Sequence, residues 1–106
     1  MNLRRGTTPT LTIRVIDMDV GDMGSIYVTF KQGEKLLTKT NEQISVDTEY
    51  NTVSIPFSQE ETLLFGRGMV ETQIRALLKD GTTAVASKIR SFSMEKILLD
   101  GVISEV

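Results

Sequence analysis

The segment "MVETQIRALLKDGTTAVASKIRSF", residues 69–92, decides the predicted fold of this chain. Apolar and polar residues alternate on both sides of Asp80-Gly81, a pair typical of two-residue type I′ turns between antiparallel strands. If this pair forms the loop, Glu71 lies opposite Arg90 and the two charges attract. The same register places Ala76 opposite Val85 and puts one set of apolar side chains on a single face: Val70, Ile74, Ala76, Leu78, Val85 and Ile89. The segment therefore predicts a β-hairpin with one buried face.

The same period-two alternation continues towards the N-terminus. It predicts strands in "TLTIRVI" (10–16), "SIYVTFKQ" (25–32) and "KLLTKT" (35–40). Gly33-Glu34 suits a type II′ turn between the last two, because glycine tolerates the positive φ needed at its first position. That register would place Val28 opposite Lys39, an apolar residue against a charged one, so a longer loop is the alternative.

Two further strands are predicted in "QISVD" (43–47) and "TVSIPF" (52–57). Pro56 has no amide donor, so its strand is expected to lie at a sheet edge or to end there. The total is seven short strands at intervals of roughly 8 to 12 residues, a pattern typical of a β-sandwich.

One short helical turn interrupts this all-β pattern at "SQEETLLF", residues 58–65. Ser58 and Glu61 form the S-x-x-E signature of a capping box, in which each side chain binds the other residue's amide. Leu64 and Phe65 are expected to plug the end of the sandwich. The turn would lie between the fifth and sixth strands of a single domain spanning residues 1–106.

The composition excludes several classes of function. The 106 residues include no cysteine and no histidine, and the net charge is −2. Disulfides and thiolate metal sites are therefore absent, as are the commonest general base and nitrogen ligand. The weak negative charge offers no general attraction to nucleic acid or anionic membranes. We expect a protein that folds in a reducing cytoplasm, is not an enzyme and uses no cofactor or metal.

Two groups of charged residues are candidate sites. Asp17, Asp19 and Asp22 alternate like the start of a calcium loop, but an EF-hand would have glycine at the position of Asp22. An acidic turn is therefore favoured over a cation site. A basic stripe of Arg75, Lys88 and Arg90 is expected on the outer face of the last hairpin. A solvated sheet face is favoured there over nucleic-acid binding, because aromatic platforms are missing.

The C-terminal segment "SMEKILLDGVISEV", residues 93–106, is apolar for a terminus. Its pattern fits either a helix or a continuation of the seventh strand. It either packs on its own sandwich or docks on a neighbouring molecule. Five large aliphatic residues form the predicted interface: Ile97, Leu98, Leu99, Val102 and Ile103.

Three segments carry a resemblance to a known family: "RRGTTPTLTI" (4–13), "SIPFSQEETLLFGRGMVETQIRALLKDGT" (54–82) and "MEKILLDGVI" (94–103). Together they resemble small tail-associated proteins of phages and prophages of Gram-positive bacteria. These are similar to the N-terminal immunoglobulin-like domain of the phage baseplate upper protein. The resemblance implies an immunoglobulin-like β-sandwich and brings no catalytic residues.

The resemblance also implies a structural role in the virion tail. We therefore expect a non-catalytic assembly or adaptor subunit of a phage tail or baseplate, made and folded in the bacterial host cytoplasm. Its expected partners are other tail or baseplate proteins and further copies of itself, not nucleic acid or a membrane. The alternative is a small glycan- or ligand-binding module that acts in host recognition.

Overall fold

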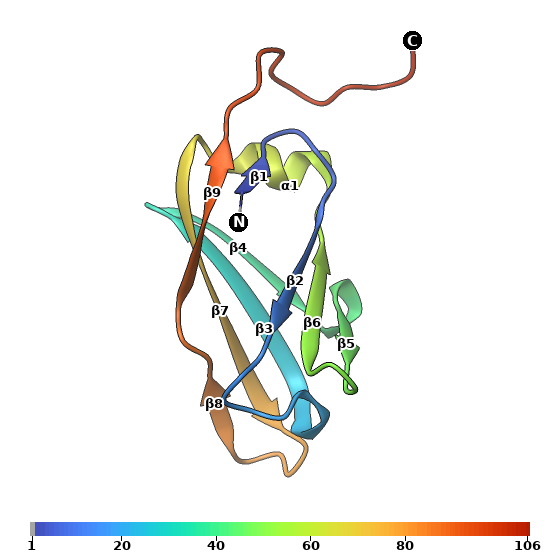
Figure 1. Ribbon diagram of the computed structural model, residues 1–106, viewed down its shortest axis with the longest axis vertical. Helices are drawn as coiled ribbons and strands as arrows, with labels where there is room; N and C mark the ends of the chain where they lie inside the picture. The colour runs from blue at the N-terminus through green and yellow to red at the C-terminus, as the bar shows by residue number, and fades with distance from the viewer. Residues whose placement is uncertain (1) are drawn as a thin grey trace.

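The computed structural model describes residues 2–106 and consists of two β-sheets packed face to face (Figure 1). The larger sheet has the strand order β1 (Asn2–Arg4), β9 (Arg90–Glu95), β7 (Gly68–Leu78), β3 (Met23–Gln32) and β4 (Lys35–Thr40), with β8 (Ala84–Ala86) also beside β7. The smaller sheet has the order β2 (Thr10–Arg14), β6 (Thr52–Pro56) and β5 (Ser45–Asp47). All pairings are antiparallel except that of β1 with β9.

The predicted all-β, immunoglobulin-like sandwich is confirmed. The helix α1 (Gln59–Leu64) connects β6 to β7, which are the fifth and sixth of the predicted strands. The structure adds β1, which the alternation did not predict, and divides the last predicted strand into β8 and β9. Pro56 ends β6, which is the central strand of its sheet and not an edge.

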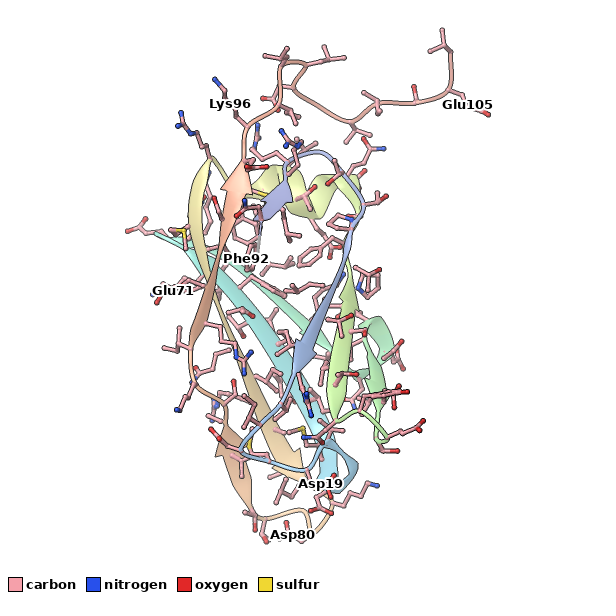
Figure 2. The ribbon with its side chains drawn as sticks, in the orientation of Figure 1. Asp19, Glu71, Asp80, Phe92, Lys96 and Glu105 are labelled. Atoms are coloured by element: carbon pink, nitrogen blue, oxygen red, sulfur yellow. The ribbon has the colours of Figure 1, made fainter. Side chains whose placement is uncertain are left out.

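Aromatic rings from both sheets meet in the core. Phe30 of β3 packs edge-on against Phe57, with ring centroids 5.0 Å apart, and against Phe92 of β9 at 6.2 Å. Figure 2 shows Phe92 on β9. Val53 and Ile55 of β6 complete the layer and are fully buried. The core therefore follows from the period-two faces that the sequence predicts.

The β3–β4 hairpin has the tighter of the two predicted connections. Gln32 lies opposite Lys35, and Gly33 between them has a φ of 60°. Val28 does lie opposite Lys39, whose side chain points into the sandwich. The longer loop is therefore not formed, and the buried lysine needs a partner, described below.

The turn of the last hairpin differs from the prediction. Ala76 lies opposite Val85 as expected. Gly81 has a φ of 79°, but Asp80 does not have the positive φ that a type I′ turn requires at both positions. The Leu78 amide donates to the Thr83 carbonyl, so the loop spans four residues instead of two.

The register of this hairpin then shifts by one residue. Ser87 pairs with Ile74, whereas Arg90 lies opposite Thr72, so Lys88 and Ile89 together face Gln73. This β-bulge turns Ile89 outward, where 59% of it is exposed. The predicted pairing of Glu71 with Arg90 and the core position of Ile89 are wrong. Phe92 and Met94 occupy the core instead.

The C-terminal segment forms no helix, and the seventh predicted strand continues into it only through Ser93–Glu95. β9 ends at Glu95, and residues 96–106 are irregular. Figure 1 shows this segment leaving the sandwich at the end that carries α1 and then turning sideways above that end. We refer to residues 96–106 as the tail.

Candidate interface at the α1 end of the sandwich

Local sequence signals fix α1 as predicted. Ser58 Oγ accepts a hydrogen bond from the Glu61 amide at 3.2 Å, and Glu61 Oε1 accepts one from the Ser58 amide at 2.8 Å. This reciprocal capping box satisfies two amides at the start of the helix. Phe65 plugs the end of the sandwich and is fully buried, but Leu64 is 39% exposed and does not.

Arg5 closes the other end of the helix. Its guanidinium donates to the carbonyls of Phe65 and Leu63, at 2.7 and 3.1 Å. These carbonyls lack intrahelical partners, and a cation at a helix C-terminus is favourable. The same guanidinium pairs with Asp100 at 3.1 Å. One side chain therefore connects the N-terminal segment, α1 and the tail.

Two further contacts hold the tail. The Gln59 amide group donates to the Ile103 carbonyl at 3.1 Å and accepts from the Ile103 amide at 2.8 Å. Ile97 is half-buried, and its Cδ1 lies 2.9 Å from the position that a Cβ on Gly6 would occupy. The tail is thus attached at Ile97, Asp100 and Ile103.

The attached tail leaves most of its apolar side chains in solvent. Of the five predicted interface residues, only Ile97 packs on its own sandwich. The exposed fractions are 99% for Leu98, 73% for Leu99, 54% for Val102 and 60% for Ile103. We call these four residues the tail patch. Sequence reasoning missed Arg5 and Gln59, the residues that hold the tail.

Lys39 connects β4 to the same end of the sandwich. Its Nζ lies 2.8 Å from Glu61 Oε1, donates to the Pro56 carbonyl and sits 5.4 Å from the centroid of the Phe57 ring. Burial alone would raise the pKa of Glu61. The hydrogen bonds from Lys39 and Ser58 and the charge of Lys39 outweigh burial and lower that pKa below its ordinary value. In the sequence, the signal for the Lys39–Glu61 pair was the register that places the charged Lys39 opposite the apolar Val28.

Two of the three aspartates of the acidic turn, Asp19 and Asp22, make hydrogen bonds within the protein. Asp19 Oδ1 accepts from the Gly21 amide at 2.8 Å and caps the 3-10 helix Val20–Asp22. The Asp22 carbonyl accepts from the Lys79 amide. Across residues 2–106, no three acidic side chains gather where they could hold a metal ion.

The predicted basic stripe is divided between two places. Arg75 lies on the outer face of the larger sheet beside Tyr27, where a shallow depression of about 400 Å³ also includes Thr29. Arg90 and Lys88 instead lie next to β2, and Arg90 donates to the Arg14 carbonyl at 3.2 Å. The β-bulge causes this separation, because it shifts the alternation after Ser87.

Comparisons with known proteins add no relatives: no protein-family model matches the chain, and no curated protein matches it in sequence. Within residues 2–106, the structure has no helix with the length and apolar character needed to cross a membrane. The geometry at the α1 end therefore stands as the principal basis for assigning a function.

Proposed function

We propose that this protein is a non-catalytic structural subunit of a phage or prophage tail or baseplate, made in the host cytoplasm and assembled into the virion. In this proposal the tail patch docks on another copy or on another tail protein. The resemblance of residues 4–13, 54–82 and 94–103 to tail-associated proteins supports the class of protein.

The observation that carries the proposal is a tail that is fixed in place and yet exposed. Arg5 and Gln59 hold the main chain near Asp100 and Ile103, so less conformational freedom is lost when a partner binds. Large aliphatic side chains that gather in solvent mark interaction surfaces. A fixed apolar surface suits an assembly subunit better than a solvated terminus.

A truncation tests the tail. Met94 is buried and β9 ends at Glu95, so the cut belongs after Lys96, which leaves the sandwich intact. We expect the full chain to associate in sedimentation equilibrium and the 1–96 protein to remain a monomer. Circular dichroism and urea denaturation check that both proteins fold. Identical association of the two folded proteins would show that the tail is not the interface.

The virion assignment has its own test. Antibodies against the purified protein should label particles from the source strain at the tail and not at the capsid, as seen by immunogold electron microscopy. Reading frames for tail proteins should flank the coding sequence. Particles that lack the protein would contradict the assignment.

A second candidate function rests on the outer face of the larger sheet. Tyr27 is 48% exposed and lies beside Arg75 in the depression of about 400 Å³. An aromatic ring with neighbouring hydroxyl and guanidinium donors can bind a saccharide. A saturable thermal shift with cell-wall saccharides, abolished in Tyr27→Ala but kept in Tyr50→Ala, would favour this glycan-binding function.

A further inference from the structure

We propose that the tail of one copy adds a strand to the free edge of β2 in a second copy and fills the crevice between β2 and β9. This inference rests on the proposed function in one respect: that the tail is an interface. It adds the surface that receives the tail, which we call the β2–β9 seam. The seam is lined by Leu11, Ile13, Arg14, Lys88, Arg90 and Phe92.

The seam consists of two adjoining crevices between the sheets. One has a volume of about 150 Å³ and is walled by Leu11, Ile13 and Phe92. The other, of about 100 Å³, shares Ile13 and Arg90 with the first and continues to Arg14 and Lys88. An apolar half is therefore followed by a basic half along the direction of β2.

In the part of the chain that the structure describes, none of the cations of the basic half forms an ion pair. Among residues 2–106, no carboxylate lies within ion-pair distance of Arg14, Lys88 or Arg90. Asp17 lines the far end of the same crevice but pairs with none of them. Three unpaired cations at an apolar crevice fit a ligand that is apolar and then acidic.

The apolar half contains a polar atom without a partner. Thr72 is 4% exposed and lines the larger crevice, and its Oγ1 has no hydrogen-bond partner in the described structure. Buried hydroxyl groups are nearly always hydrogen-bonded, so an unpaired one facing a crevice points to an occupant. A polar group of an occupant that reaches into this crevice would supply that partner.

Apart from the Arg14 carbonyl, which accepts a hydrogen bond from Arg90, the backbone beside the crevices is also open. β2 is an edge strand, since its partner in the smaller sheet is β6 alone. β1 covers β9 at Ser93–Glu95 and leaves Arg90–Phe92 without a neighbour on that side. Unpaired strand edges are ready templates for an added strand.

The tail has the matching order of side chains. The tail bends at Gly101, where φ is 91°; when docking straightens this bend, Leu99, Ile103 and Glu105 share one face, because alternate residues do. Leu99 and Ile103 would enter the apolar half and Glu105 would reach the basic half. The span from Leu99 to Glu105 is about 20 Å, enough to run beside β2.

The occupant belongs to a second copy because the tail points away from its own seam. Figure 1 shows the tail leaving the body, and Figure 2 shows Glu105 far from β2. Gln59 also holds Ile103 against α1 in the same molecule. A tail on one surface and a seam on another give a head-to-tail contact that repeats from copy to copy.

Cross-linking tests this geometry, and the chain offers a clean background because it has no cysteine. Thr12→Cys lies on the outward face of β2, and Ser104→Cys lies on the face of the extended tail opposite to Ile103. The two full-length single-cysteine proteins are mixed and oxidised. We expect their mixed disulfide to form on the order of a hundredfold faster than that of Thr38→Cys with Ser104→Cys. Thr38 is the matched control on the outer face of the larger sheet.

A charge swap tests the register. Arg14→Glu combined with Lys88→Glu should weaken association about fivefold, and Glu105→Lys in the same chain should restore it. The control Arg75→Glu should leave association unchanged. Equal cross-linking rates at Thr12 and Thr38 would show that the tail does not bind the β2–β9 seam. The tail could still be the interface in that case, and loss of association on removal of residues 97–106 would support it. A full chain that stays monomeric at millimolar concentration would overturn the seam as well.

Discussion

The ammonium group of Lys39 lies 2.8 Å from the carboxylate of Glu61, and this contact joins the edge of the larger sheet to the first turn of α1. Both groups are drawn out of water, since only 6% of the Lys39 side chain and 21% of the Glu61 side chain are exposed. Glu61 also caps the helix through the Ser58 amide. The pair therefore couples the helical corner to β4.

Removing both members of this pair should destabilise the fold by less than the sum of removing each one alone. Lys39→Met leaves the Glu61 carboxylate without its cation, and we expect a loss of about 2 kcal/mol in the free energy of unfolding. Combining it with Glu61→Gln should cost less than the sum of the two single changes. Urea denaturation of the four proteins measures this. Strict additivity would show that the two side chains do not interact.

Acid should weaken the stabilisation that Glu61 provides through Lys39 and the Ser58 amide. The pKa of Glu61 is lowered below its ordinary value of 4.5, so the folded state binds its proton less readily than the unfolded state does. The resulting stabilisation is complete above pH 4.5 and is lost as the pH falls through the folded-state pKa. The difference in melting temperature between the wild type and Glu61→Gln should therefore shrink as the pH falls below 4.5. A constant difference would contradict this.

Asp80 should titrate unusually low for a surface carboxylate. Its Oδ2 accepts from the Thr83 hydroxyl and its Oδ1 from the amides of Thr82 and Thr83, which lowers its pKa from 3.8 to about 2. An NMR titration of the carboxyl carbon should give a midpoint near that value. In Thr83→Val the hydroxyl donor is lost, and the midpoint should move back towards 3.8.

Arg5 should be needed to keep the tail in place. Arg5→Gln removes the ion pair with Asp100 and weakens the cap on α1, and we expect a loss of about 2 kcal/mol in the free energy of unfolding. Gln59→Ala should leave stability nearly unchanged, because it removes only the exposed contact with Ile103. Both variants should speed amide hydrogen exchange at Ile103. Unchanged exchange in both would show that neither residue holds the tail.

Substitutions at two glycines can distinguish the cost of backbone strain from the cost of disturbed packing. Gly6 and Gly33 have positive φ values of 71° and 60°, but a Cβ on Gly6 would meet Ile97 whereas one on Gly33 would meet nothing within 4 Å. Gly33→Ala should cost about 1 kcal/mol from backbone conformation alone. Gly6→Ala should cost more and should displace Ile97. Equal losses in thermal or urea denaturation would show that Ile97 does not press on Gly6.

The features that sequence predicted correctly are those with short-range causes. Ser58 and Glu61 are three residues apart, and their capping box needs no tertiary contact. The register of the β3–β4 hairpin likewise has a local cause, because Gly33 adopts the positive φ that the tight turn requires. The alternation of buried residues also held wherever the strands were regular, as at Ile55 and Ile74.

The features that sequence missed depend on partners far along the chain. The bulge at Lys88 and Ile89 follows from Ser87, whose hydroxyl accepts from the Ile74 amide and replaces a regular ladder contact. Arg5 finds its carbonyl acceptors about 60 residues away, at Leu63 and Phe65. No periodicity within a single segment reports such contacts. The candidate interface was therefore predicted as a set of apolar residues, without the groups that fix them.

The parallel pairing of β1 with β9 has a mechanical consequence. Asn2, Leu3 and Arg4 lie beside Ser93, Met94 and Glu95, and Arg4 adds an ion pair with Glu95 at 2.9 Å. Opposing pulls on the N-terminal end of β1 and the C-terminal end of β9 would slide these parallel strands along each other. Sliding stretches every hydrogen bond between them at once, whereas peeling would break them one after another. A pull on the two ends of the chain would therefore meet its first resistance at this short ladder.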